Sequence, residues 1–247
     1  MEKNNIVAII QARMGSTRLP GKILEDIEGK PMLWHVVNRI GFSKMINKIV
    51  VATTLNKIDD LVENLCKKNN VDCYRGSEVD VLDRYYNAAK EWCADVVVRI
   101  TSDCPLIDPM VADKVILAYL KNENSFDGSS NTIKRTYPHG LDVEVISYDT
   151  LERACEEAKK DYQREHVTIY IYENPSKFKI LNVENNKDLS CLRWTVDEKK
   201  DLEFVREIYK LLHNKSMFLM DDIIDLLERN PSIKEINKDV EQKKINK

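Results

Sequence analysis

Short runs of apolar residues alternate with amphipathic segments along most of the chain. Residues 5–11 read NIVAIIQ, and residues 48–53 and 95–101 repeat this continuous apolar pattern. Runs of this length without polar alternation are typical of strands buried on both faces of a sheet. Shorter strands are predicted at residues 71–74, 143–146, 177–182 and 192–196.

The segments between these runs have helical spacing of their apolar residues. In residues 31–40, for example, Trp34, Val37 and Ile40 share one face, and Pro31 and Gly41 stand where a short helix begins and ends. Further helices are predicted at residues 59–68, 82–92, 109–121, 150–160, 199–212 and 220–229. Strands that alternate with helices favour an α/β fold with a mostly parallel sheet and helices on both faces.

The remaining segments are predicted loops, and they do not divide the chain. Residues 12–30 are polar and contain three glycines, and residues 125–139 are again polar. Neither a Pro/Gly-rich linker nor an internal repeat is visible. We expect one domain over residues 1–233 and a charged, solvated C-terminal tail over residues 234–247 whose charges have no specific partner.

Composition excludes several classes of protein. The chain has 247 residues, 43% hydrophobic and 32% charged, with 38 basic against 41 acidic residues and a net charge of −3. This apolar content excludes a disordered chain, and the charge balance argues against a nucleic-acid partner. No stretch approaches the ~18 apolar residues of a membrane helix. The apolar run 6–10 is too short for a signal peptide, so we expect a cytoplasmic protein with no membrane partner.

The six cysteines do not point to a metal site. They form no C-x-x-C pair and have no histidine at zinc-ligand spacing. We expect reduced, mostly buried thiols.

The first loop carries the strongest chemical signal. The chain has only seven glycines, yet Gly15, Gly21 and Gly29 fall within fifteen residues of one another. Residues 11–22, QARMGSTRLPGK, also place three cations directly after a buried strand: Arg13, Arg18 and Lys22. Ligands of open α/β sheets bind at the carboxyl ends of the strands, and backbone N–H groups with such cations suit several phosphate oxygens. We therefore expect an exposed loop that binds a triphosphate; the alternative is a merely solvated surface.

This loop is not a Walker A motif. Five residues, not four, separate Gly15 from Gly21, and Ile23 stands where the serine or threonine that holds magnesium is required. A kinase or ATPase of that class is therefore disfavoured.

Two aspartates follow predicted strands and are candidate metal ligands. Asp103 lies in RITSDCP at residues 99–105, and Asp197 ends LRWTVD at residues 192–197. Asp103 could instead cap its turn with Pro105, and Asp197 could be a helix N-cap. Magnesium usually takes one or two protein carboxylates and completes its shell with phosphates and water, so this pair would suffice. The residues alone leave open whether the two meet.

Two further motifs contain polar residues beside predicted strands or helices. They are YPHGLDVE at residues 137–144 and QREH at residues 163–166. The planar guanidinium of Arg164 could bind a carboxylate or a phosphate through two hydrogen bonds. For His139 and His166, a structural and a functional role are equally open.

Together these motifs resemble the spore-coat-polysaccharide type of cytidylyltransferase, a relative of the acylneuraminate and keto-deoxyoctulosonate cytidylyltransferases. The motifs occur in order between residues 9 and 197, and the first, IIQARMGSTRLPGK, is highly specific. The resemblance implies a three-layer, GT-A-like nucleotidyltransferase fold with a mixed, mostly parallel sheet. It also implies a Mg²⁺-dependent reaction in which a nucleoside triphosphate and a sugar give a nucleotide sugar and pyrophosphate.

The resemblance also assigns roles to residues. Arg13 and Lys22 match the family's triphosphate-binding residues, and Asp103 and Asp197 match its metal-binding aspartates. We assign catalysis to Arg13, Lys22 and Asp103. The expected nucleotide site comprises Gln11, Ala12, Arg13, Gly15, Ser16, Arg18, Lys22, Arg84 and Ser102. The expected acceptor site comprises His139, Asp142, Glu144, Arg164 and His166.

The expected reaction is transfer of CMP from CTP to a sugar or sugar acid for surface polysaccharide or glycoconjugate biosynthesis. The alternatives are a guanylyltransferase that uses GTP and a sugar 1-phosphate, a GT-A glycosyltransferase, and a non-catalytic nucleotide sensor. Pyrophosphate release separates a nucleotidyltransferase from the last two. The sequence does not identify the acceptor, and a homodimer that uses residues 125–139 and those that follow is possible.

Overall fold

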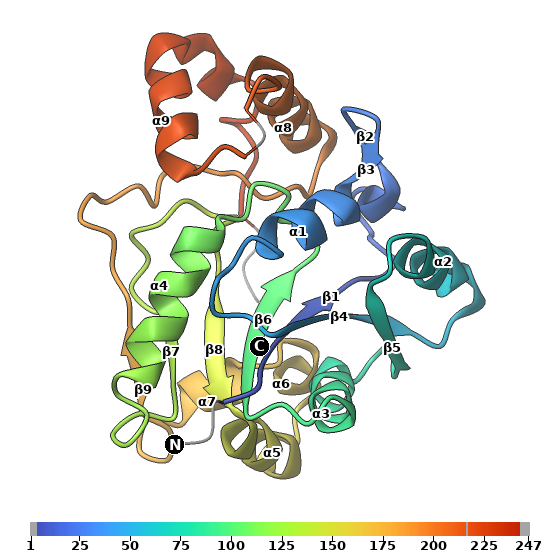
Figure 1. Ribbon diagram of the computed structural model, residues 1–247, viewed down its shortest axis with the longest axis vertical. Helices are drawn as coiled ribbons and strands as arrows, with labels where there is room; N and C mark the ends of the chain where they lie inside the picture. Colours follow the sequence, from blue (N-terminus) through green and yellow to red (C-terminus); the bar gives the residue numbers. More distant parts are fainter. Residues whose placement is uncertain (1–3, 216, 243–247) are drawn as a thin grey trace.

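A seven-stranded sheet lies between two layers of helices (Figure 1) in the computed structural model, which describes residues 4–215 and 217–242. The strand order is β5-β4-β1-β6-β8-β7-β9, and β2 and β3 form a separate two-stranded hairpin. The strands are β1 (Ile6–Gln11), β2 (Asp26–Ile27), β3 (Lys30–Pro31), β4 (Lys48–Thr54), β5 (Asp72–Gly76), β6 (Val96–Thr101), β7 (Gly128–Ser130), β8 (Glu144–Ser147) and β9 (Ile180–Asn182).

The sheet is mixed but mostly parallel. Strands β5, β4, β1 and β6 run parallel to one another, and β9 runs parallel to β7. Only β8 reverses direction, because it pairs antiparallel with both β6 and β7. The predicted α/β class with a mixed, mostly parallel sheet is confirmed.

The helices cover both faces of the sheet. They are α1 (Met32–Ile40), α2 (Asp60–Lys68), α3 (Val81–Glu91), α4 (Pro109–Leu120), α5 (Tyr148–Glu157), α6 (Asp161–Glu165), α7 (Ile169–Glu173), α8 (Lys199–Leu211) and α9 (Met220–Arg229), with 3-10 turns η1 (Lys22–Leu24), η2 (Lys57–Asp59) and η3 (Pro231–Glu235). In the central strand β1, Ala8 and Ile10 belong to the core shared with α1, α2 and α4, whereas Val7 and Ile9 belong to the core shared with α3, α5 and α7. Successive residues of a strand point to opposite faces, which explains why the apolar run has no polar alternation. Helices α8 and α9 lie beyond the end of the sheet toward which β6 points (Figure 1).

Two predicted segments differ from the structure. Residues 125–139 are not only a loop, because they contain β7, whose three residues are buried. A side chain at position 128 would place its Cβ 2.3 Å from the Val145 carbonyl oxygen, so glycine permits the close pairing with β8. Conversely, residues 192–196 form no strand, and their pairing is limited to one bridge between Arg193 and His139.

Three smaller expectations can be compared with the described residues. Of the expected tail 234–247, residues 234–242 lie within them. Asn237 there is buried, and Asp239 and Lys238 pair with Lys200 and Glu235, so the expectation that the charges of the tail have no partner is wrong for these two. The six cysteines, all of them described, are free, but only Cys66 and Cys104 are buried, so the expected burial of most thiols is wrong. Over the two described ranges, no helix has the length and apolar character needed to cross a membrane.

Candidate active site

A cavity of about 310 Å³ opens at the carboxyl ends of β1 and β6. This is the edge at which open α/β sheets bind their ligands. Its walls combine the loop after β1, the start of α3, the turn after β6 and the segments before α7 and α8. The lining residues are Gln11, Ala12, Arg13, Gly15, Ser16, Thr17, Arg18, Lys22, Ile23, Val81, Arg84, Thr101, Ser102, Asp103, Glu165, His166 and Asp197.

The loop after β1 is fixed to the body of the protein by its backbone. The Met14 amide donates to Oδ1 of the buried Asp59 at 2.7 Å, and the amides of Ser16 and Gly21 donate to the Met14 carbonyl. Gly21 has φ 72°, a left-handed conformation that favours glycine, and the chain turns there into η1. Lys22 consequently points inward and is buried. The expectation of an exposed loop is therefore wrong at Lys22.

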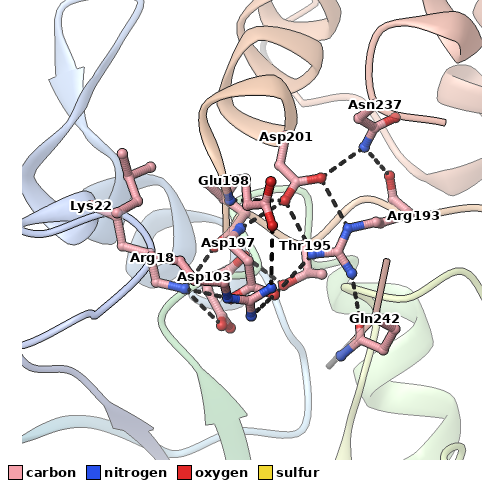
Figure 2. A network of polar contacts seen from close by, with 12 residues as sticks. Arg18, Lys22, Asp103, Arg193, Thr195, Asp197, Glu198, Asp201, Asn237 and Gln242 are labelled. Atoms are coloured by element: carbon pink, nitrogen blue, oxygen red, sulfur yellow. Dashed lines mark hydrogen bonds and ion pairs between the residues drawn. The ribbon is translucent and has the colours of Figure 1, made fainter. Parts of the chain in front are cut away.

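Lys22 joins the two candidate metal ligands. Its Nζ lies 3.1 Å from Asp103 Oδ2 and 3.0 Å from Asp197 Oδ1, and it donates to the Val196 carbonyl at 2.7 Å (Figure 2). Burial alone would lower the pKa of Lys22, but the attraction of both carboxylates outweighs it and the pKa is raised. Burial alone would likewise raise the pKa of Asp103, but Lys22 and the Thr101 hydroxyl lower it. Both residues are therefore charged in this arrangement.

The roles of turn cap for Asp103 and helix N-cap for Asp197 do not account for the positions of the two side chains. Asp103 Oδ1 accepts from the Thr101 hydroxyl at 2.6 Å and Oδ2 accepts from Lys22, so side chains engage both oxygens. The N-cap of α8 is Glu198, not Asp197. The carboxylate of Asp201 accepts the backbone N–H groups of Asp197 and Glu198, so the Asp197 carboxylate is left to face the cavity.

The other cations around the cavity are also held in place. Arg18 Nη2 lies 2.8 Å from Asp197 Oδ2, and Arg13 Nη1 lies 3.3 Å from Glu78 Oε1. Arg84 is only 2% exposed and donates from Nη1 to the Ser77 carbonyl, while its buried Nε has no partner within the described residues. The structure thus brings Arg13, Arg18, Lys22 and Arg84 to one cavity, as the sequence led us to expect.

The expected acceptor residues are largely placed elsewhere. Of the five, all within the described ranges, only His166 lines the cavity. Asp142 is paired with Arg135, Arg164 binds Asp80 at the start of α3, and His139 bonds through its backbone to residues 192 and 194. These three are held by structural partners.

Glu144 forms a buried ion pair with Arg99 beneath the cavity. Its Oε1 also accepts from the hydroxyls of Thr168, at 2.6 Å, and Tyr172, at 2.5 Å. Burial would raise the pKa of Glu144, but Arg99 and the two hydroxyls lower it. Arg99 Nη2 in turn lies 3.3 Å from Gln11 Oε1, so this pair supports the floor of the cavity.

Several residues that shape the site were not found from the sequence. Asp59 anchors the loop after β1, Thr101 binds Asp103, and Arg193 and Asp201 lie behind Asp197. Thr101 and Arg193 carried a signal, because they lie in the RITSDCP and LRWTVD motifs, whereas Asp59 and Asp201 lie in no motif singled out above.

The pair Asp103 and Asp197 fits a magnesium ion. Two carboxylates already face a common cation, the Lys22 ammonium, and carboxylate oxygens are ligands that Mg²⁺ prefers. No group of three or more His, Cys, Asp or Glu side chains in residues 4–215 and 217–242 could hold a metal without further ligands. A metal here would therefore depend on phosphate and water oxygens for the rest of its shell.

A family model described as cytidylyltransferase matches residues 7–245. The chain belongs to the cytidylyltransferase family. A spore coat polysaccharide biosynthesis protein of Bacillus subtilis is 34% identical over 235 residues, which cover 92% of this chain and 96% of that protein. A 3-deoxy-manno-octulosonate cytidylyltransferase of Geobacter sulfurreducens is 34% identical over 146 residues, which cover 59% of this chain and 58% of that enzyme.

The solved structures agree with this assignment. A cytidylyltransferase from Leptospira borgpetersenii superimposes with a TM-score of 0.90 at 36% identity, over 99% of this chain and all of that one. The resemblance to the spore-coat type of cytidylyltransferase is thus confirmed, and the protein is a nucleotidyltransferase of that family.

Proposed function

We propose that this cytidylyltransferase transfers CMP from CTP to a sugar acid with release of pyrophosphate, and that it uses Mg²⁺. The observation that carries the proposal is the meeting of Lys22 with Asp103 and Asp197 at the rim of a cavity that Arg13 and Arg18 also line. Cations for phosphate and carboxylates for a divalent metal are the two components that such a transfer needs. The sugar acid is proposed because a relative named above acts on 3-deoxy-manno-octulosonate.

The residues of the chain position the reactants and need not form a covalent intermediate. A hydroxyl oxygen of the acceptor attacks the α-phosphorus and loses its proton, while the bond from that phosphorus to the bridging oxygen of pyrophosphate breaks. Arg13 and Arg18 line the cavity and are placed to hold phosphate oxygens, and Lys22 supplies a third cation. Asp103 and Asp197 would hold Mg²⁺, which supplies neutralisation of the phosphate charge.

Lys22 has two possible sets of partners in this scheme. Its ammonium now binds the carboxylates that the metal requires. If the Lys22 ammonium moved to phosphate oxygens, it would stay charged and paired. Asp103 and Asp197 would then be available as metal ligands. We therefore propose that Lys22 leaves the carboxylates when the metal and the nucleotide bind.

The test is a grid of the four nucleoside triphosphates against sugar acids and sugar phosphates, with Mg²⁺ and a pyrophosphate readout. We expect pyrophosphate with CTP and a sugar acid, and none with an Asp103→Asn variant. A Lys48→Met variant, which alters an exposed ion pair far from the cavity, should retain full activity. Release with GTP and a sugar 1-phosphate instead would overturn the choice of substrates, and no release with any pair would overturn the reaction.

A further inference from the structure

Asp197 is held from behind by a second layer of charged groups. Its Oδ1 faces Lys22, whereas its Oδ2 accepts from Arg193 Nη2 at 2.9 Å. Arg193 itself donates two hydrogen bonds to Asp201, with Nε 3.0 Å from Oδ1 and Nη2 3.1 Å from Oδ2. A planar guanidinium held at two points by a carboxylate has little rotational freedom, so Arg193 fixes the orientation of the Asp197 carboxylate.

Asp201 adds a backbone restraint to the same unit. Its Oδ2 accepts the amide of Asp197 at 2.9 Å, and its side chain is completely buried. Arg193 and Asp201 therefore fix both the main chain and the side chain of the expected metal ligand.

The C-terminal segment completes this layer (Figure 2). The buried Asn237 donates from Nδ2 to the Arg193 carbonyl and to Asp201 Oδ1, both at 3.0 Å. Gln242 Oε1 accepts from Arg193 Nη1. Residues 237–242 thus bind Arg193 at its main chain and at its guanidinium. Neither Asn237 nor Gln242 lines the cavity, and their printed contacts lead to Asp197, which does line it, only through Arg193 and Asp201.

We propose that this C-terminal segment, through Asn237 and Gln242, holds Arg193 and Asp201 in position and thereby sets the affinity of the active site for its divalent cation. Asn237 is a positioning residue, because it acts on Asp197 only through Arg193 and Asp201. The proposal rests on the proposed function in one respect, that Asp197 is a metal ligand. Partners of this kind behind a metal ligand typically account for about 10–100-fold in metal affinity.

The experiment compares Asn237→Ala with a matched control in the same segment. Asp239→Ala removes an exposed ion pair, 3.6 Å from Asp239 Oδ2 to Lys200 Nζ, and does not touch Arg193. Binding of Mn²⁺ alone is measured by the electron paramagnetic resonance of the free ion, and the Mg²⁺ dependence of pyrophosphate release is measured at saturating CTP. We expect Asn237→Ala to weaken Mn²⁺ binding by about tenfold and to raise the half-activating Mg²⁺ concentration by a similar factor. Turnover at saturating Mg²⁺ should stay within threefold of the wild type, and Asp239→Ala should match the wild type throughout.

A second variant keeps the proposal testable if Asn237→Ala does not fold. Gln242→Ala removes only the exposed partner of Arg193, and it should weaken Mn²⁺ binding in the same direction by a smaller factor. Unchanged Mn²⁺ affinity in the folded variants would overturn the positioning role, and so would an equal loss in Asp239→Ala. If the wild type binds Mn²⁺ but releases no pyrophosphate, the proposed reaction fails while the comparison of metal affinities stands.

Discussion

Replacing Lys22 by methionine should destabilise the protein in the absence of divalent cations. Methionine keeps the length and the apolar stem of the side chain but removes the ammonium that Asp103 and Asp197 share. The side chains of Lys22 and Asp197 are 11% and 12% exposed and that of Asp103 is 27% exposed, so the two carboxylates would be left close together with only partial access to water. In the exposed loop expected from the sequence, such a change would leave the fold intact, and the burial of Lys22 reverses that expectation.

The size of the effect follows from the contacts that remain. Removing one partner of a buried ion pair costs about 3–5 kcal/mol. Asp103 keeps its bond from Thr101, and Asp197 keeps Arg18 and Arg193, so we expect the lower end, about 3 kcal/mol. For a domain of this size, 1 kcal/mol corresponds to roughly 2–4 °C, so the midpoint of thermal unfolding should fall by roughly 6–12 °C.

The assay is thermal unfolding with EDTA and with added Mg²⁺. The metal should stabilise the variant more than the wild type, because no ammonium competes for its carboxylates; a cation at about one hundred times its Kd contributes about 2.7 kcal/mol. Lys48→Met is the control, because Lys48 and Asp72 form an exposed pair that contributes at most about 1 kcal/mol. Equal midpoints for the two variants in EDTA, or an equal gain from Mg²⁺ in wild type and Lys22→Met, would refute the reasoning.

Four further outcomes are expected. Arg13→Ala should leave the unfolding midpoint unchanged, because its side chain is 41% exposed, yet lower the rate of pyrophosphate release by about 10²–10³; a fully active variant would remove Arg13 from the site. Asp103→Asn and Asp197→Asn should each abolish turnover, and the double variant should be scarcely worse in the same assay, since residues that act as one unit are not additive; losses that multiply would contradict a shared metal site. Gly140→Ala should lower the midpoint of thermal unfolding, because φ at this position is 104° and the new Cβ would lie 2.7 Å from the backbone of residue 194. We expect strain of about 1–3 kcal/mol, and an unchanged midpoint would show that the backbone adapts. CTP should outcompete GTP in competition binding with Mg²⁺, and preference for GTP would make guanosine the base.

Apolar patterning predicted the parts of the fold that are buried on both faces. Strand β1 was recognisable because its residues are almost all apolar. Strand β7 was not, because its three residues are Gly128, Ser129 and Ser130. They are nonetheless buried, and the Ser129 hydroxyl donates to the Val115 carbonyl at 2.7 Å. Small polar residues whose hydrogen bonds are satisfied inside the protein resemble a loop when only the sequence is read.

The cations and aspartates that line the cavity could be singled out from the sequence, but their pairing could not. Arg13, Lys22 and Asp103 could be found because each follows a buried strand at its carboxyl end. The burial of Lys22 depends on Asp197, which is 175 positions away and comes beside it only in the folded chain. The same holds for Arg164, which is bound by Asp80, 84 positions away, a partner that no local pattern indicates.

Each cation of the loop after β1 already has a carboxylate partner: Arg13 has Glu78, Arg18 has Asp197, and Lys22 has Asp103 and Asp197. A single small anion, such as inorganic phosphate, would compete with these carboxylates for the cations. A divalent cation alone meets the opposite difficulty, because it must displace the Lys22 ammonium from both carboxylates and leave it with the Val196 carbonyl. When both arrive together, the phosphates receive the released cations and the metal receives the released carboxylates. The metal and the nucleotide should therefore bind cooperatively, each strengthening the binding of the other by the same factor.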